Sequence, residues 1–247
     1  MGNATVLCRA LGRYKMLVDA NDLAIVPHLC LDGYWESWIT AALARALRPG
    51  FWCLDVGANH GYYTLLMADA VGSGGRVLAV EPNPNLVRLL KFSLEINGLT
   101  GRASAMACAA SDVDNVRVNL VFPRQHAVYA TICRSPGEGD ESIEVGTVAL
   151  DTVSRDWPHV DLVKIDAEGA EQKIWRGMQQ TMRRNPDVIV VMEVNRTRIS
   201  DPAGFVREIR DAGFTLRHIT FDAEVRTLTE EALLASENDW MLFLQRG

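Results

Sequence analysis

The chain has 247 residues, of which 48% are hydrophobic and 23% charged, as in an ordinary globular protein. Its net charge of -6 argues against a nucleic-acid-binding surface, for which a basic face is expected, and against binding to acidic lipids. No apolar run approaches the roughly 20 residues that span a bilayer, and the N-terminus does not resemble a signal peptide. The five cysteines lack C-x-x-C spacing, which predicts reduced thiols in a cytoplasmic protein.

The predicted elements form an N-terminal β-ribbon over residues 1–32 and an α/β domain over residues 33–247. The ribbon is expected from short β-prone runs, which are 5–8, 14–18 and 23–26. A helix is predicted at 34–47, and strands and helices alternate after it, which indicates a mostly parallel sheet covered by helices on both faces. The strand runs are 51–55, 76–81, 103–108, 160–166, 187–194, 213–221 and 239–245, and the helical runs are 61–70, 84–97, 169–183 and 201–212. The short link before the last strand run predicts that this strand is antiparallel.

An insertion at about residues 113–150 interrupts this alternation. Its β-like runs are 116–122, 128–133 and 143–150, and they predict an antiparallel hairpin after the third strand of the sheet. The hairpin either shapes a substrate pocket or is a decoration without a role in binding. His126, within the insertion, is a weak candidate for contact with the substrate.

The segment 53–61, Cys-Leu-Asp-Val-Gly-Ala-Asn-His-Gly, has the pattern of a strand, a glycine turn and a helix N-terminus. Parallel α/β sheets bind small molecules at such points, and glycine allows the backbone to approach a ligand closely. Glu81 ends the next strand run, where an acid accepts hydrogen bonds from both ribose hydroxyls of a nucleoside. The turn does not match the dinucleotide pattern G-x-G-x-x-G. Asp55 repels a phosphate and suits an ammonium group, so the motif favours S-adenosylmethionine over NAD.

Further segments follow this turn in a characteristic order. Between about residues 33 and 195 they are Asp55–Thr64, Ala79–Pro84, Glu95–Leu99, Ala109–Asp112, Leu150–Asp151, Asp161–Glu171, Arg176–Gly177 and Glu193. Together they resemble the class I S-adenosylmethionine-dependent methyltransferases and, more narrowly, the FkbM family. The segment 164–171, Lys-Ile-Asp-Ala-Glu-Gly-Ala-Glu, is the most specific of them, whereas His60 departs from the apolar residue that is usual in the family.

The resemblance implies a Rossmann-like fold and O-methylation of a hydroxyl on a sugar, a glycolipid or a secondary metabolite. It implies that Asp55, Gly57 and Gly61 line the methionine part of the cofactor and that Glu81 holds the ribose. Glu36, at the position of a family Gly-x-x-Glu, either closes over the cofactor or caps a helix. The remaining expected cofactor-binding residues are Ala58, Asn59, Tyr63 and Asn83, with Ser111 and Asp112 near the adenine.

Acidic residues after the fourth strand run are the predicted catalytic groups. An aliphatic hydroxyl is a poor acid, so a base or a metal must assist its methylation. Asp166 is the leading candidate for the base, and Glu168 follows it in the turn. His60, in the glycine turn, is the alternative base, or else a structural residue. Glu171 is expected to cap the following helix or to form a salt bridge.

A divalent metal ion is the second hypothesis for activating the hydroxyl. Asp166, Glu193 and Asn195 end adjacent strand runs and offer oxygen ligands that suit Mg²⁺, Mn²⁺ or Ca²⁺. The predicted function is therefore an S-adenosylmethionine-dependent O-methyltransferase that acts on a sugar, glycan or natural product, with or without a metal. The alternatives are a catechol or phenol O-methyltransferase and a non-catalytic S-adenosylmethionine-binding protein. The expected partner is a small molecule or a glycan, and the oligomeric state, including a homo-oligomer, stays open.

Overall fold

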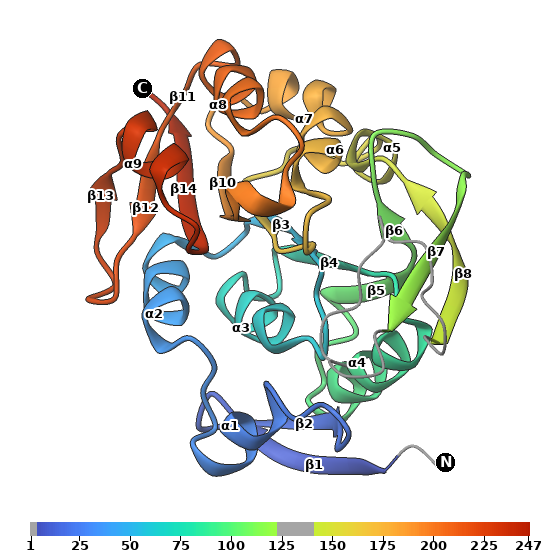
Figure 1. Ribbon diagram of the computed structural model, residues 1–247. Helices are drawn as coiled ribbons and strands as arrows, with labels where there is room; N and C mark the ends of the chain where they lie inside the picture. Colours follow the sequence, from blue (N-terminus) through green and yellow to red (C-terminus); the bar gives the residue numbers. More distant parts are fainter. Residues whose placement is uncertain (1–3, 123–140) are drawn as a thin grey trace.

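The computed structural model describes residues 4–122 and 141–247. A mixed sheet of nine strands in these residues has the order β13-β12-β14-β10-β9-β3-β4-β5, with β11 paired to β14 (Figure 1). Its parallel strands are β3 (Trp52–Val56), β4 (Arg76–Glu81), β5 (Ala103–Ala107), β9 (Leu162–Ile165) and β10 (Ile189–Val194). The last strand, β14 (Trp240–Arg246), runs antiparallel to β10, which confirms the predicted closing strand.

Helices cover both faces of this sheet, as the alternation of elements predicted. Side chains of successive strand residues point to opposite faces, so Cys53 and Leu54 of β3 enter two different apolar clusters. The first face carries α2 (Ser37–Ala46), α3 (Tyr62–Ala70) and α4 (Pro84–Ile96). The second carries α5 (Leu150–Val153), α6 (Glu171–Arg176), α7 (Gln179–Arg184), α8 (Pro202–Asp211) and α9 (Glu230–Ala235). The sheet is therefore buried on both sides, and polar side chains at its strand ends stand out as candidate functional groups.

The N-terminal ribbon consists of β1 (Thr5–Ala10) and β2 (Tyr14–Asp19), which pair antiparallel as predicted. β2 lies against α4, where the Leu17 amide donates to the Ser93 hydroxyl at 2.9 Å. The prediction of a third strand at 23–26 is wrong, because α1 (Val26–Leu31) begins there. Pro27 has the fixed φ of a first helical turn. The Asp22 carboxylate accepts from the backbone amides of Ala24 and Ile25, which lie just before the helix.

The insertion after β5 forms the predicted antiparallel hairpin. β7 (Arg117–Phe122) pairs with β8 (Glu141–Val148), and β6 (Ala109–Ala110) joins β8 in a separate three-stranded sheet. The predicted run 128–133 and His126 lie outside the described residues. The run predicted at 143–150 ends at Val148, because α5 begins at Leu150.

Two predicted elements are interrupted in the structure. The helix expected at 169–183 divides into α6 and α7 at Gly177, where a Cβ atom would lie 2.0 Å from the Ser111 carbonyl oxygen. The strand expected at 213–221 divides into β11 (Phe214–Thr215) and β12 (Arg217–Ile219). Both keep one register against β14, but the carbonyl of Leu216 between them accepts from Leu228 instead. β12 then pairs with β13 (Val225–Thr227).

Of the helices within residues 4–122 and 141–247, none is long and apolar enough to cross a membrane.

Candidate active site

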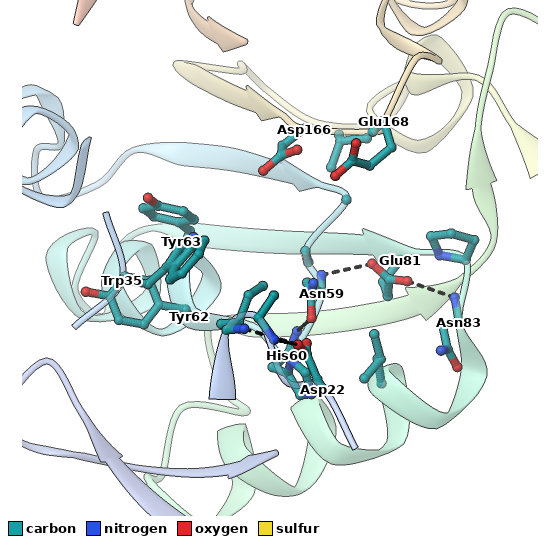
Figure 2. A pocket seen from close by; sticks show the side chains of 18 of the residues that line it. Asp22, Trp35, Asn59, His60, Tyr62, Tyr63, Glu81, Asn83, Asp166 and Glu168 are labelled. Carbon is teal, nitrogen blue, oxygen red and sulfur yellow. Dashed lines mark hydrogen bonds and ion pairs between the residues drawn. The ribbon is translucent and has the colours of Figure 1, made fainter. Parts of the chain in front are cut away.

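A cavity of about 860 Å³ opens at the carboxyl ends of β3, β4 and β9, the edge at which parallel α/β sheets bind small molecules. The glycine turn (residues 57–61) forms its floor, and Figure 2 shows Glu81 and Asn83 on one side of this turn and Asp166 and Glu168 on another. The cavity thus joins two groups of polar side chains. We call them the ribose end (Asn59, Glu81, Asn83) and the carboxylate cluster (Asp166, Glu168, Glu193).

The glycines of the turn are required by close packing of the protein itself. Gly57 has a φ of +70°, and a Cβ atom there would lie 1.7 Å from the carbonyl oxygen of Asp166. Gly61 has a φ of +90°, and its Cβ would lie 2.0 Å from a methyl carbon of Leu90. The sequence predicted close approach to a ligand. The structure adds that the space of both missing side chains is filled by the Asp166 carbonyl, just after β9, and by Leu90 of α4.

Glu81 is the central group of the ribose end. Its side chain is nearly buried, and its two oxygens accept from the backbone amides of Asn59 at 2.8 Å and Asn83 at 2.9 Å. Asn59 lies in the turn at a φ of +52°, and Asn83 caps α4 through the Asn85 amide. Burial raises the pKa of Glu81 to about 7. The carboxylate is therefore held rigidly beside the cavity, with its remaining lone pairs available to two hydroxyls.

Asp55 lies beneath the cavity wall. It is fully buried, its Oδ2 accepts from the Thr64 hydroxyl at 2.5 Å, and its Oδ1 has no hydrogen-bond partner in the protein. Burial raises its pKa, and the positive charge of Lys164, its register partner on β9, opposes that rise. The structure thus places Asp55 next to a buried lysine, whereas the sequence predicted contact with the methionine part of the cofactor.

Lys164 links the floor of the cavity to the carboxylate cluster. Its buried ammonium lies 3.1 Å from Asp166 Oδ2 and 4.8 Å from the centre of the Tyr63 ring. The Tyr63 hydroxyl in turn donates to Glu36 Oε2 at 2.8 Å. Burial raises the pKa of Glu36, and the Asp166 charge adds to the effect. Glu36 makes no side-chain cap bond to α2 and lines the cavity, so of its two predicted roles the geometry supports closure over a ligand.

His60 ties the ribbon to the glycine turn. Its Nε2 accepts from the Asp19 backbone amide at 3.1 Å, and its Nδ1 lies 3.6 Å from Asp22 Oδ2 (Figure 2). Burial lowers the pKa of His60, against the nearby charges of Asp22 and Asp19. Because Nε2 accepts a hydrogen bond, the proton of the ring lies on Nδ1. The basic nitrogen is engaged with the backbone, which supports a structural role. The predicted role as a general base remains a prediction.

The carboxylate cluster is assembled at the ends of β9 and β10. Asp166, Glu168 and Glu193 each offer an oxygen within 4.8 Å of the others. Burial, together with the charge of Asp166, raises the pKa of Glu168 to about 7 and that of Glu193 to about 9. Arg198 opposes both shifts, because its Nη1 lies 2.7 Å from Glu168 Oε2 and 3.0 Å from Glu193 Oε1.

The predicted metal-ligand set differs from this cluster at one residue. The Oδ1 of Asn195 accepts from the Thr197 amide at 2.9 Å, and its Nδ2 donates to Asp239 at 2.8 Å, so Glu168 stands where Asn195 was expected. Three carboxylates suit a hard divalent cation. However, the guanidinium of Arg198 already lies between Glu168 and Glu193. The residues present therefore do not fit a divalent metal ion in addition to Arg198.

Ser111 and Asp112 were expected near the adenine. The Ser111 hydroxyl donates to Asp112 Oδ1 at 3.0 Å, and Asp112 is exposed. The neighbouring residue Ala110 lines the cavity, together with Ser142 and Ile143 of β8. The hairpin thus forms part of the wall, which favours the pocket-shaping interpretation over decoration.

Several wall residues were not predicted from the sequence. They come from the ribbon and the segment that follows it, and they include Asp19, Asn21, Asp22, Ile25 and Trp35. The polar run Asp-Ala-Asn-Asp at 19–22 was the available signal, but it reads as an ordinary turn. Ala58 lines the cavity as predicted. The Glu171 carboxylate accepts from the amides of Ala167 and Gly169, so it stabilises the loop before α6, and its predicted role as a helix cap stays a prediction.

Residues 55–216, more than half of the chain, match the model of the Methyltransferase FkbM domain family. The chain belongs to the FkbM family. Among curated proteins, methyltransferase sdnD of Sordaria araneosa is 24% identical to it over an alignment of 156 residues that covers 51% of this chain and 60% of that protein. A protein-L-isoaspartate O-methyltransferase of Aeropyrum pernix is 46% identical over 54 residues, 22% of this chain and 21% of that enzyme. The FkbM chain thus spans less than two thirds of each relative.

Solved structures show the same fold at low sequence identity. A TehB-like S-adenosylmethionine-dependent methyltransferase of Corynebacterium glutamicum has a TM-score of 0.52 at 11% identity, over 90% of this chain and 95% of that one. Pyrococcus horikoshii TYW2, solved in complex with MeSAdo, has a TM-score of 0.53 at 13% identity, over 98% of this chain and 70% of that one. These likenesses establish the Rossmann-like methyltransferase fold.

The FkbM domain of this chain is an S-adenosylmethionine-dependent methyltransferase domain. Its residues fit that cofactor. Glu81 offers fixed acceptors for ribose hydroxyls, and the acids that surround Lys164 favour a sulfonium cation nearby. The cavity volume of about 860 Å³ lies in the upper part of the range of about 300–1,000 Å³ for small-molecule sites. The cavity is therefore large enough to take an acceptor beside the cofactor.

Proposed function

We propose that the protein is an O-methyltransferase that acts on a hydroxyl of a sugar, glycan or other natural product. The observation that carries this proposal is the position of Asp166. Its carboxylate lies at the cavity, 3.1 Å from the buried ammonium of Lys164, and its backbone carbonyl packs against Gly57 of the glycine turn. The name of the Aeropyrum pernix relative, an O-methyltransferase, also supports transfer to oxygen.

S-Adenosylmethionine, when bound, supplies a methyl group activated by a sulfonium. The protein has to hold the acceptor oxygen in line with that group and remove its proton, and positioning alone supplies a large part of the rate. We assign removal of this proton to Asp166. A general base typically contributes about 10²–10⁴-fold to the rate. Lys164 holds the base in place, and Glu81 orients the ribose. Tyr63 and Glu36 form the wall beside Lys164.

Assistance by Mg²⁺ or Mn²⁺ at the carboxylate cluster is the metal-dependent version of the same reaction. That version requires the ion to displace the guanidinium of Arg198 from Glu168 and Glu193. The metal-free version needs no such rearrangement, and we adopt it. A small molecule or a glycan is the proposed partner. The odd number of cysteines and their lack of C-x-x-C spacing support a reducing compartment such as the cytoplasm.

Labelled methyl transfer tests the proposed function. The full chain is incubated with S-adenosylmethionine carrying an isotopic methyl group and a panel of sugars, glycosides, polyhydroxylated natural products, catechols and simple phenols. We expect a product that gains one labelled methyl group on an aliphatic hydroxyl, identified by mass spectrometry and NMR. Methylation of phenols alone would instead establish the catechol-type alternative. Tight binding of S-adenosylhomocysteine without any product would favour a non-catalytic protein.

A further inference from the structure

Arg198 is the shared partner of the acids at the acceptor side of the cavity. Its guanidinium contacts Glu168 at 2.7 Å, Glu193 at 3.0 Å and Asp239 at 3.5 Å, and all four side chains line the cavity. Lys164 separately pairs with Asp166 at 3.1 Å. Each of these four acids therefore already has a cationic partner within the protein.

The local backbone is built to bring Arg198 to this position. β10 ends at Val194, and the one-turn helix η1 (Arg196–Arg198) follows at once, so that the chain doubles back over Glu193. Asn195 stabilises this turn by accepting from the Thr197 amide at 2.9 Å and the Thr197 hydroxyl at 2.6 Å. The residue that the sequence suggested as a metal ligand is thus the cap of the turn that carries Arg198.

The opposite loop is shaped to meet the same arginine. Glu168 has a φ of +51° and Gly169 a φ of +104°, which turns the chain sharply after β9. A Cβ atom on Gly169 would be 3.4 Å from both the Cβ and the carbonyl oxygen of Arg198. Gly169 therefore supplies a φ that other residues rarely adopt, and the turn that it makes lies against Arg198, with the Glu168 carboxylate at the guanidinium.

A divalent ion among the same oxygens would lie close to this guanidinium. Two cations at such a distance repel each other, and removal of one partner from a partly buried cluster leaves uncompensated charge. A guanidinium also offers planar, fixed donors that match two carboxylates at once. The Arg198 guanidinium accordingly stands in this cluster in place of a metal ion.

We propose that Arg198 is the resident cation of the carboxylate cluster, that it positions Glu168 and Glu193, and that it makes the acceptor site independent of divalent metal. The inference rests on the proposed function only in naming this end of the cavity the acceptor site. Arg198 is a positioning residue, since it acts through the carboxylates that it holds.

Cation binding tests this proposal without any acceptor. Mn²⁺ is titrated by calorimetry into the metal-stripped full chain saturated with S-adenosylhomocysteine. We expect no saturable binding to the wild type. In Arg198→Ala the three carboxylates lose their cation, so Mn²⁺ should bind at one site. Its dissociation constant should be at least about tenfold lower than that of any binding to the wild type. The double variant Arg198→Ala with Glu193→Gln should lose that site again.

The control is Arg198→Lys, which keeps a positive charge and should bind Mn²⁺ as poorly as the wild type. Arg198→Gln replaces the alanine variant if that variant fails to fold, as judged by its melting temperature and its affinity for S-adenosylhomocysteine. Saturable Mn²⁺ binding to the wild type that is lost in Glu193→Gln would overturn the proposal. So would a folded Arg198→Ala protein that gains no Mn²⁺ site.

Activity gives an independent readout once an acceptor is known. Wild-type turnover should be unaffected by a chelator, and the turnover lost in Arg198→Ala should recover in part with added Mn²⁺ or Mg²⁺. If no hydroxyl is methylated by the wild type, the proposed function fails. The calorimetric test of Arg198 uses no acceptor, so its result is independent of that failure.

Discussion

The ribose end and the carboxylate cluster hold their acids by different means. At the ribose end, Glu81 is fixed by two backbone amides that lie within 22 residues of it in the chain. In the carboxylate cluster, Glu168 and Glu193 are held by a side chain, Arg198, that comes from a later turn. Backbone donors cannot move without unfolding the turn, whereas an ion pair of partly buried side chains is adjustable. The first arrangement suits a constant ligand, and the second suits a variable acceptor.

The ribose end and the carboxylate cluster are connected through the contact between Gly57 and Asp166. The α-carbon of Gly57 faces the carbonyl oxygen of Asp166 so closely that no side chain fits between them. Asp166 N also donates to the Val56 carbonyl at 3.0 Å. The glycine turn therefore fixes the position of the proposed base, so that a change at Gly57 and a change at Asp166 both test the comparison.

The largest effect is expected from Asp166→Asn, which removes the proposed base and keeps its size. Turnover should fall by about 10²–10⁴-fold, while affinity for S-adenosylhomocysteine should change little because Glu81 is untouched. Single-turnover methyl transfer and calorimetry measure the two quantities. Asp222→Asn is the matched control, since Asp222 is an exposed aspartate paired with Arg226 and should tolerate the same exchange. Near-normal turnover of Asp166→Asn would remove this residue from the mechanism.

Gly57→Ala should damage both ends together. The added methyl group meets the Asp166 carbonyl oxygen at 1.7 Å, so the free energy of unfolding should fall by about 2–5 kcal/mol from strain and overpacking combined. Gly72→Ala provides the control, because Gly72 has a similar φ of +64° with nothing within 4 Å of its added Cβ. It should cost about 1 kcal/mol. Equal losses of unfolding free energy in the two variants, measured by urea denaturation, would mean that the contact between Gly57 and the Asp166 carbonyl is unimportant.

A smaller effect is expected from Glu81→Gln, which should weaken S-adenosylhomocysteine binding by about 10- to 100-fold at pH 8 through the lost ribose contact. Burial raises the pKa of Glu81 to about 7. The charged carboxylate accepts hydrogen bonds on both oxygens and is populated above that pH. Wild-type affinity should therefore rise as the pH increases from 6 to 8 and then level off.

The variant should show a flat pH dependence over the same range. Glu168→Gln serves as the control, since the pKa of Glu168 is also raised to about 7 but its carboxylate lies in the other group. Its affinity for S-adenosylhomocysteine should keep the wild-type dependence on pH. If Glu81→Gln retains the slope instead, another group controls the binding.

Local sequence patterns were sufficient for the sheet and for the ribose end. The turn at 57–61 and the acid Glu81 follow directly from two successive strand–helix junctions, and the two amides that fix Glu81 come from these same junctions. Boundaries were less predictable. The break at Gly177 depends on the Ser111 carbonyl. The helix α1 stands where a strand was expected, with Pro27 in its first turn and Asp22 binding the amides just before it.

The sequence by itself determined the fold class, the FkbM relationship and the residue types at the strand ends, because these depend on periodicity and on short motifs. Only the tertiary structure decided which of those residues act together. It buried Asp55 beside Lys164, engaged His60 with the ribbon, and exchanged Asn195 for Glu168 in the carboxylate cluster. It also brought in Arg198, which no motif singled out. Ion pairs between separate loops depend on how those loops pack, and spacing along the chain carries no record of that packing.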